Sequence, residues 1–359
     1  MKNYKITAPA LIFFIILLTG CSKSKDVTPE MIKIGKELQS ASMLDFIEGT
    51  NTIQLATNDS GLIGVVSKMQ VVGERIYIMD SYIAKSIFVF DMHGKLINRF
   101  GKIGGGPGEY LLITDFFVDK ANKRIRLLAN GNKIIDTDLD GNYVKEQILN
   151  YPHLSFLFPV GNNLFLGNHV TAGDEYLLYV VNPNYKETGR YLPLPSGYEK
   201  VAISTFVGYT GIDDKYLFAP VASPIIYGIN RNGCLPKYEF DFDNSLKLTH
   251  DKIKNLEKEN NIMSVIEKTK DLFCLTSYFE TNENLFVTYS LKEEDYWGIY
   301  DREERQFKCV NTKKITNLLG IDTPKVYFLS QVDNNTIAGI YNNEEKELNP
   351  MVLICRLKH

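Results

Sequence analysis

The histidines are the first candidates for chemistry in this sequence of 359 residues. The chain contains 5 His, and none falls in the HxxxH or HExxH spacing by which a helix binds zinc. We expect only His153 and His169 to lie on a face where a ligand would bind. No GxSxG turn occurs, and no Ser–His–Asp set is evident. The sequence therefore specifies no catalytic reaction.

Oxygen-bearing side chains are the second candidates, because Ca²⁺ prefers carboxylate and amide oxygens. The residues that could offer such oxygens to a central channel are Asp80, Asp115, Asn168, Asp174 and Glu280. The chain has 43 acidic residues, so a set of this kind also arises by chance. We expect no resident cofactor and no dedicated metal site, with Ca²⁺ in the channel as the open alternative.

A glycine-rich stretch, residues 101–110, lies between two apolar segments. Its spacing matches neither a phosphate-binding loop nor a dinucleotide fingerprint, and no helix follows to offer its N-terminus to a phosphate. It is therefore interpreted as a sharp connector. Glu109 and Tyr110 end it, and we expect them to contact a ligand at the channel mouth. The other candidate ligand-binding residues on that face are Asp80, Tyr82, His153 and His169.

Tyrosine is abundant in the predicted loops of the same face. Its apolar body and polar tip suit the binding of sugars or peptides, and ordinary loop packing is the alternative. The tyrosines in question are Tyr82, Tyr110, Tyr151, Tyr198 and Tyr209.

The stretch from Ser86 to Asp119 shows how these residues are positioned. Two alternating apolar segments flank the turn Asp91–Gly94, which predicts a β-hairpin. The glycine-rich connector and a third strand, Ile113–Asp119, follow. In the first such unit we expect strands over residues 65–72, 75–80, 87–91 and 96–100.

The same pattern recurs about every 45 residues, and a period of this length with four strands is typical of a propeller blade. Asp or Asn ends the strand before each turn, at Asp91, Asp138, Asn182, Asn230 and Asp301. Later blades are expected to begin near Ile113, Ser155, Ala202, Cys274 and Lys325. The sequence thus predicts an all-β, six-bladed β-propeller of four-stranded antiparallel blades over residues 50–359. The last blade lacks a strand, and residues 52–57 are expected to supply it and close the ring.

The N-terminus predicts export. Lys2 and Lys5 precede a short apolar run that ends in Leu18-Thr19-Gly20-Cys21. This tetrapeptide resembles the bacterial lipobox, so residues 1–20 are interpreted as a signal peptide and Cys21 as the lipidation site. Residues 21–49 are then a lipidated tether with a short helix over residues 28–40, capped by Thr28 and started by Pro29.

A charged insertion, residues 243–271, interrupts the repeat. Thr249 is a helix cap, and the apolar spacing predicts two helical pieces. The insertion is either a lid over the central channel or a solvated decoration. Four cysteines remain after Cys21, in apolar strand contexts and without metal-like spacing: Cys234, Cys274, Cys309 and Cys355. Buried thiols are favoured over disulfides.

Charge excludes one class of partner. The net charge is −3 and no basic stripe is present, so nucleic acid is not an expected partner.

Residues 87–119 resemble an NHL-type repeat, with FDxxGK, FG, GxGPGEY and a strand ending in VD. With the lipobox and the six-fold count, the chain resembles the six-bladed propeller lipoproteins of Bacteroidetes, an NHL-like or TolB-like group. This resemblance implies a lipid-anchored location in the bacterial cell envelope, on the outer membrane. It implies little about function, because one fold hosts many functions.

Two functions remain open. The favoured one is a membrane-tethered, non-catalytic binding or scaffold module with an unknown protein or glycan partner at the channel-mouth face. The alternative is an envelope hydrolase or lyase that acts on a sugar or lactone-like substrate with a divalent metal in the channel.

Overall fold

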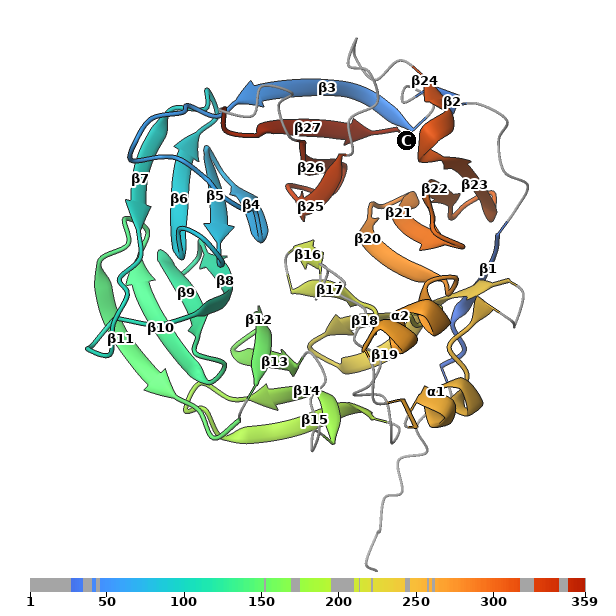
Figure 1. Ribbon diagram of the computed structural model, residues 1–359, viewed down its shortest axis with the longest axis horizontal. Coiled ribbons are helices and arrows are strands. Elements are labelled where there is room, and N and C mark those ends of the chain that lie inside the picture. The colour runs from blue at the N-terminus through green and yellow to red at the C-terminus, as the bar shows by residue number, and fades with distance from the viewer. Residues whose placement is uncertain are drawn as a thin grey trace, which may run out of the picture.

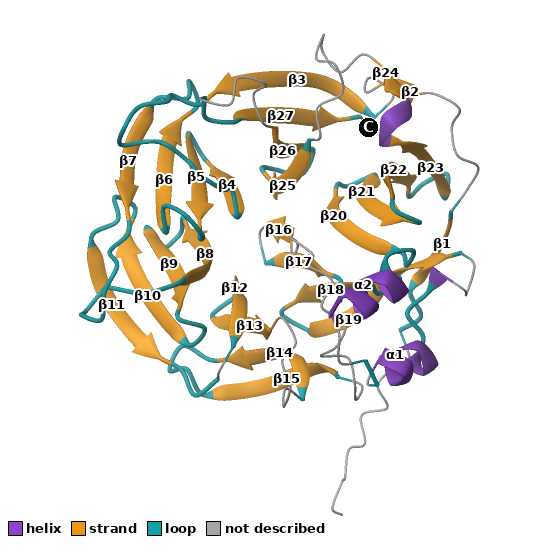
Figure 2. Ribbon diagram, viewed as in Figure 1, coloured by secondary structure: helices purple, strands orange, loops and turns teal. Residues whose placement is uncertain are grey.

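The computed structural model is a ring of six blades around a central axis (Figures 1 and 2). It describes residues 27–34, 41–42, 46–151, 153–168, 175–194, 210–212, 214–220, 222–242, 246–256, 258–259, 262–316, 326–341 and 348–358. In each blade, four strands pair antiparallel in order from an inner strand to an outer one. The all-β, six-bladed architecture predicted from the sequence is confirmed.

The first three blades follow directly in sequence. Blade 1 contains β4 (Lys68–Val72), β5 (Arg75–Asp80), β6 (Ser86–Asp91) and β7 (Leu96–Phe100). Blade 2 contains β8 (Ile113–Asp119), β9 (Arg124–Ala129), β10 (Lys133–Asp138) and β11 (Tyr143–Ile148). Blade 3 contains β12 (Leu154–Val160), β13 (Asn163–Asn168), β14 (Tyr176–Val181) and β15 (Glu187–Pro193).

The other three blades complete the ring. Blade 4 contains β16 (Thr210–Ile212), β17 (Lys215–Phe218), β18 (Ile225–Asn230) and β19 (Gly233–Asp241). Blade 5 contains β20 (Cys274–Glu280), β21 (Asn284–Leu291), β22 (Glu294–Asp301) and β23 (Gln306–Asn311). Blade 6 contains β25 (Tyr327–Gln331), β26 (Thr336–Tyr341), β27 (Met351–Leu357) and β3 (Ile47–Gln54). A short parallel pair joins β2 (Ala41–Ser42) to β24 (Ile315–Thr316).

The ring closes through β3, which pairs antiparallel with β27 in blade 6. Asn349 reinforces this closure from a fully buried position. Its Oδ1 accepts a hydrogen bond from the backbone N–H of Ile63 at 2.9 Å, and its Nδ2 donates to the carbonyl of Gly61 at 2.7 Å. An N-terminal closing strand is confirmed, but it runs over Ile47–Gln54 rather than over the expected residues 52–57.

The strand turns form where Asp or Asn was expected to bend the chain. Asp91 Oδ1 accepts hydrogen bonds from the backbone N–H groups of His93 and Lys95, both at 2.9 Å. Gly94 completes the turn with a φ of 80°, which residues without a Cβ adopt at low cost.

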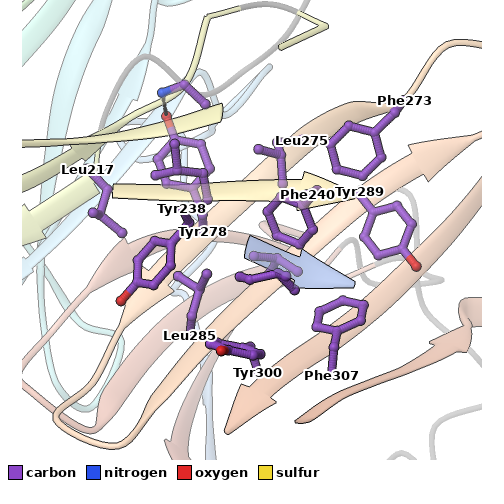
Figure 3. Packing of buried hydrophobic residues seen from close by; sticks show 14 of the residues in the cluster. Leu217, Tyr238, Phe240, Phe273, Leu275, Tyr278, Leu285, Tyr289, Tyr300 and Phe307 are labelled. Atoms are coloured by element: carbon purple, nitrogen blue, oxygen red, sulfur yellow. Dashed lines mark hydrogen bonds between the residues drawn. The ribbon is translucent and has the colours of Figure 1, made fainter. Parts of the chain in front are cut away.

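Neighbouring blades pack through apolar clusters and through polar links between inner strands. Between blades 4 and 5, the rings of Phe240 and Phe273 lie 5.4 Å apart in a cluster that also holds Phe307 (Figure 3). Between blades 6 and 1, the backbone N–H of Val71 donates to Ser330 Oγ at 3.2 Å.

A helix was predicted over residues 28–40, and this prediction is wrong for residues 30–33. They form strand β1 (Glu30–Lys33), which pairs in parallel with β19 and makes blade 4 five-stranded. Ile32 is fully buried in the cluster between blades 4 and 5. Burial of this side chain against an open sheet edge outweighs the helical spacing of Met31, Ile34 and Leu38, since local propensity is a weak prior. Residues 35–40, which include Leu38, lie outside the described residues.

The insertion before blade 5 contains helices α1 (His250–Leu256) and α2 (Ile262–Thr269). Thr249 caps α1 as predicted, since its Oγ1 accepts from the backbone N–H of Lys252 at 3.4 Å. In the view of Figure 1, α1 lies at the outer edge of the ring, α2 is drawn over blade 4, and neither covers the ring axis. This placement supports the decoration rather than a lid over the ring axis.

The four expected thiols are buried and form no disulfides: Cys234, Cys274, Cys309 and Cys355. Burial raises the pKa of Cys234 to about 12 and that of Cys274 to about 11. Within the described part of the chain, no helix is both long and apolar enough to cross a bilayer.

Candidate functional site

The strand order gives the ring two different faces. The β4–β5 and β6–β7 turns lie at one end of blade 1, and the β5–β6 loop and the β7–β8 crossing lie at the other end. The same holds for each blade. We call the first the hairpin face and the second the loop face. The candidate residues of the β5–β6 loop and of the glycine-rich crossing therefore share the loop face of blades 1 and 2.

Six exposed apolar side chains gather on this part of the loop face, and we call them the exposed apolar cluster: Leu62, Val65, Tyr82, Ile83, Leu111 and Leu112. Tyr82 and Ile83 are each 69% exposed and Leu111 is 63% exposed. A Cβ on Gly64 would lie 2.6 Å from Cδ1 of Ile83, so Ile83 packs directly over the Gly64 backbone.

A wholly buried carboxylate holds the first half of this cluster in place. Asp80 Oδ1 accepts hydrogen bonds from the backbone N–H of Tyr82 at 3.1 Å and of Ile83 at 2.9 Å. Its Oδ2 accepts from Gly64 at 2.9 Å and from Val65 at 3.1 Å. Burial alone would raise the pKa of this carboxyl, but these backbone donors lower it below its usual value. Asp80 therefore joins two segments that are distant in the chain.

The second half of the cluster is fixed to blade 2. Asn130 Oδ1 accepts from the backbone N–H of Leu111 at 2.9 Å and of Leu112 at 3.1 Å. Lys85 Nζ donates to the Leu111 carbonyl at 3.2 Å, which ties the β5–β6 loop to the crossing. This bond links the two halves of the cluster at the junction of blades 1 and 2.

The predicted residues Glu109 and Tyr110 support the crossing from within. Glu109 lies 2.8 Å from Lys102 Nζ and accepts from the Gly106 backbone at 2.8 Å, and the pKa of Glu109 is lowered by Lys102 first and by that backbone donor next. Tyr110 is 1% exposed and donates to the Lys85 carbonyl at 2.8 Å. Burial raises the pKa of Tyr110 to about 12. Tyr110 was expected at the channel mouth, and its burial leaves it without access to a ligand in this conformation.

The remaining candidates are placed as follows. Tyr82 is exposed within the cluster. His153 is exposed between β11 and β12, on the loop face, with a φ of 64°. His169 and Cys21 lie outside the described residues, as do Asp174, Tyr198 and Tyr209.

The acids offered for calcium do not converge. Asp115 lies 2.5 Å from Lys68 Nζ of blade 1 and accepts from the Leu157 backbone of blade 3 at 2.8 Å. Burial acts against charge on both groups, because it raises the pKa of Asp115 and lowers that of Lys68. Glu280 forms ion pairs with Lys237 and Arg302. Among the described residues, no group of three or more His, Cys, Asp or Glu could hold a metal ion.

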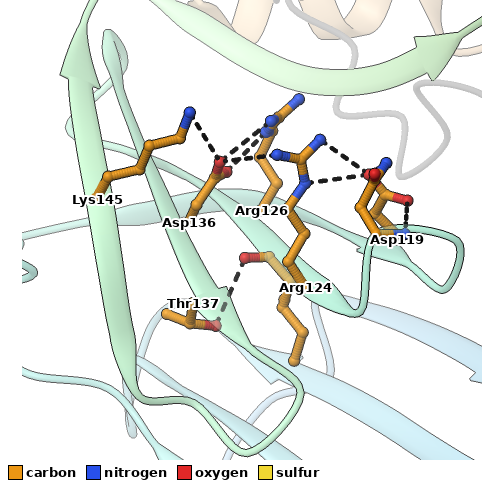
Figure 4. A network of polar contacts seen from close by, with 8 residues as sticks. Asp119, Arg124, Arg126, Asp136, Thr137 and Lys145 are labelled. Atoms are coloured by element: carbon orange, nitrogen blue, oxygen red, sulfur yellow. Dashed lines mark hydrogen bonds and ion pairs between the residues drawn. The ribbon is translucent and has the colours of Figure 1, made fainter. Parts of the chain in front are cut away.

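One polar network was not anticipated from the sequence. Asp136, on the sheet of blade 2, is 1% exposed and lies 2.8 Å from Arg126 Nε, 3.4 Å from Arg124 Nη1 and 4.0 Å from Lys145 Nζ (Figure 4). Arg124 also contacts Asp119 at 3.1 Å. The buried carboxylate is matched by cations on the neighbouring strands β9 and β11, so the network links three strands of blade 2 and its groups are paired with one another.

Asp80 and Tyr82 were both predicted to contact a ligand. Asp80 is instead wholly buried and bonded to four backbone N–H groups, so only Tyr82 is exposed to solvent. The aliphatic members of the cluster were not predicted. The signal was present in Leu111-Leu112, an apolar pair placed directly after a glycine-rich connector, where loops are usually polar. Ile83 carried the same signal within the short β5–β6 loop.

The fold and its loop face define the class of protein: a six-bladed propeller with an apolar loop-face surface. The chain belongs to the family described as a domain of unknown function, DUF4934, whose model matches residues 29–348. The NHL-like or TolB-like resemblance stays a prediction. None of the curated proteins matches the chain.

Solved structures share the fold. A crystal structure of a protein of Bacteroides fragilis that is inferred to be exported has a TM-score of 0.75 and 18% identity, covering 92% of this chain and 100% of that chain. A duf4221 family member from Bacteroides vulgatus has a TM-score of 0.56 and 9% identity, covering 87% of this chain and 97% of that chain. At these identities the likeness concerns the fold alone.

Proposed function

We propose that this chain is a lipid-anchored, non-catalytic binding module of the bacterial cell envelope, on the outer membrane, and that a protein partner docks on the exposed apolar cluster. The observation that carries the proposal is the link between Asp80 and the cluster: this buried carboxylate accepts backbone hydrogen bonds from Tyr82 and Ile83 through Oδ1 and from Gly64 and Val65 through Oδ2, which holds exposed apolar side chains in place. Contiguous exposed apolar surface typically marks an interaction site, and anchors on pre-organised loops lose little entropy on binding.

The chemistry of the cluster favours a protein over a glycan. Five of its six members are aliphatic and offer a sugar no hydrogen bonds, whereas the buried core of a protein interface is apolar and Tyr is a frequent anchor there. The acids proposed for a metal-dependent enzyme are already paired where the structure describes them, as the contacts of Asp80, Asp115 and Glu280 illustrate. The lipobox and the likeness to an inferred exported protein support the envelope location.

Site-specific photocrosslinking in the native cell tests the docking site. A benzoylphenylalanine at Tyr82 is expected to form a discrete protein adduct, and Leu111→Ser in the same chain is expected to abolish it. The matched control is benzoylphenylalanine at Tyr143, an exposed tyrosine on β11 at the rim of the ring. The same adduct from both positions, an adduct that survives Leu111→Ser, or crosslinks to lipid alone would reject the proposed protein site.

The anchor has a separate test. Cys21→Ser is expected to shift the chain from the membrane fraction to the soluble fraction, and mass spectrometry of the wild-type N-terminus is expected to find acylated Cys21. An unmodified Cys21 in a membrane-free chain would reject the lipid anchor while leaving the docking site open to test.

A further inference from the structure

Strand β1 has a defined direction relative to the two faces. It runs parallel to β19, with Glu30 opposite Tyr238 and Lys33 opposite Asp241. Strand β19 leaves the hairpin face at its turn with β18, where Asn230 pairs with Gly233, and it ends at the loop face. The chain therefore passes along β1 from the hairpin face toward the loop face, and residues 27–29 precede β1 at its hairpin-face end.

Several contacts fix β1 in this direction. Ile32 is fully buried between blades 4 and 5. Glu30 accepts a hydrogen bond from the Tyr300 hydroxyl of blade 5 at 2.8 Å. The backbone N–H of Ile34 donates to the Asp241 carbonyl at 3.3 Å, which extends the pairing by one residue. The segment that follows the proposed anchor is thus part of the sheet.

The tether between the anchor and this strand is short. Residues 22–26 separate Cys21 from Val27, and a chain of that length reaches at most about 20 Å. Figure 1 shows β1 at blade 4, across the ring from β5 and β6 of blade 1. A lipid on Cys21 would therefore lie within about 20 Å of Val27, whereas the exposed apolar cluster lies on the loop face of blades 1 and 2, across the ring from β1.

We infer that the propeller sits with its hairpin face toward the bilayer and presents the exposed apolar cluster to the aqueous space away from it. This orientation rests on the proposed lipid anchor. The polar turns at Asp91, Asp138 and Asp301 suit a face that lies at the head groups without inserting. The partner of the cluster is then a protein approaching from the aqueous side, and the bilayer that holds the anchor is excluded as the surface covering the cluster.

Fluorescence quenching on the full lipidated chain in vesicles tests the orientation. Single cysteines are placed on the hairpin face by His93→Cys and Glu304→Cys, and on the loop face by Tyr82→Cys and Leu111→Cys, and each is labelled with bimane. All four positions are exposed, and the native thiols are buried, so labelling is selective. The vesicles contain phosphatidylcholine with a nitroxide on its head group.

Hairpin-face labels are expected to be quenched at least roughly twofold more than loop-face labels, because about seven residues of strand, roughly 23 Å, separate the two faces. Equal quenching, or stronger quenching of the loop face, overturns the orientation. Failure of the chain to float with the vesicles would refute the lipid anchor and, because the orientation depends on that anchor, would refute the orientation too. Ile32→Asp provides a second check, because it is expected to detach β1 from β19 while the labelled sites stay folded. The difference in quenching between the two faces should then disappear, although the chain still floats with the vesicles. An unchanged difference in quenching would contradict the proposal that β1 fixes the orientation.

Discussion

The carboxylate of Asp80, which is fully buried, accepts a hydrogen bond at 3.1 Å from the backbone N–H of Tyr82, whose side chain is among the most exposed apolar groups of the protein. In the proposed docking site Asp80 is a positioning residue, since its buried oxygens bond the backbone of the loop that bears Tyr82. Because one residue holds the loop and the other forms its surface, mutations of Asp80 test the stability of the loop and mutations of Tyr82 test the chemistry of its surface.

Replacing the carboxylate should cost stability in a pH-dependent way. Asp80→Asn keeps the size of the side chain but puts an NH₂ group against backbone donors, which we expect to cost about 2 kcal/mol. The folded-state pKa of Asp80 is lowered, so its stabilisation is full above the unfolded pKa of about 3.9 and is lost as the pH falls through the lower folded value. Urea unfolding at pH 7, 4.5 and 3.5 should show the gap between wild type and variant shrinking with acid. A constant gap would contradict the assigned charge state.

Surface variants of the cluster should leave folding intact. Tyr82→Ser and Ile83→Ser are expected to change the free energy of unfolding by less than about 0.5 kcal/mol, because both side chains are exposed.

Tyr110→Phe should lower the free energy of unfolding by about 1 kcal/mol, because it removes the buried hydroxyl that donates to the Lys85 carbonyl. Urea unfolding of the three variants checks both values. A neutral Tyr110→Phe would contradict the supporting role given to that hydroxyl.

The repeating turns explain why the fold could be predicted. Asp91 and Gly94 form their turn through local interactions, and the alternation of apolar and polar residues in the adjacent strands indicates which strand face is buried. Strand β1 could not be predicted in this way, because its partner β19 lies about 200 residues away and its short sequence also fits a helix. Tyr110 was misjudged for a related reason: whether a loop residue points outward depends on the neighbouring blade, which sequence spacing does not reveal.

The ion pair of Lys68 and Asp115 should behave as a buried coupled pair. Asp115 also bonds blade 3, so the pair links three blades. Lys68→Met and Asp115→Asn are each expected to cost about 3 kcal/mol, and the double variant less than their sum, since removing one partner leaves a buried group uncompensated. The exposed pair of Lys313 and Glu294 is the control, with an expected coupling below about 1 kcal/mol. Equal coupling in the two cycles would refute the burial argument.

The four strand cysteines should be inert in the native domain. Burial raises the pKa of Cys234 to about 12, so little thiolate exists at pH 8. With the domain lacking Cys21, Ellman's reagent is expected to titrate no thiol in buffer and all four in guanidinium chloride. A fast-reacting native thiol would show that at least one strand opens readily, and fewer than four in denaturant would indicate a disulfide.

The contribution of β1 can be measured one side chain at a time. Ile32→Ala removes a fully buried side chain and is expected to cost about 2–4 kcal/mol at that contact. Because β1 is an additional outer strand on a complete blade, the loss should appear as local detachment rather than as unfolding of the ring. Hydrogen exchange should accelerate along residues 238–241 of β19 and stay unchanged in blade 1. Met31→Ala, on the exposed side of the same strand, is the matched control and should leave exchange in β19 at the wild-type rate. Equal protection of β19 in both variants would mean that the other contacts of β1 hold it without Ile32.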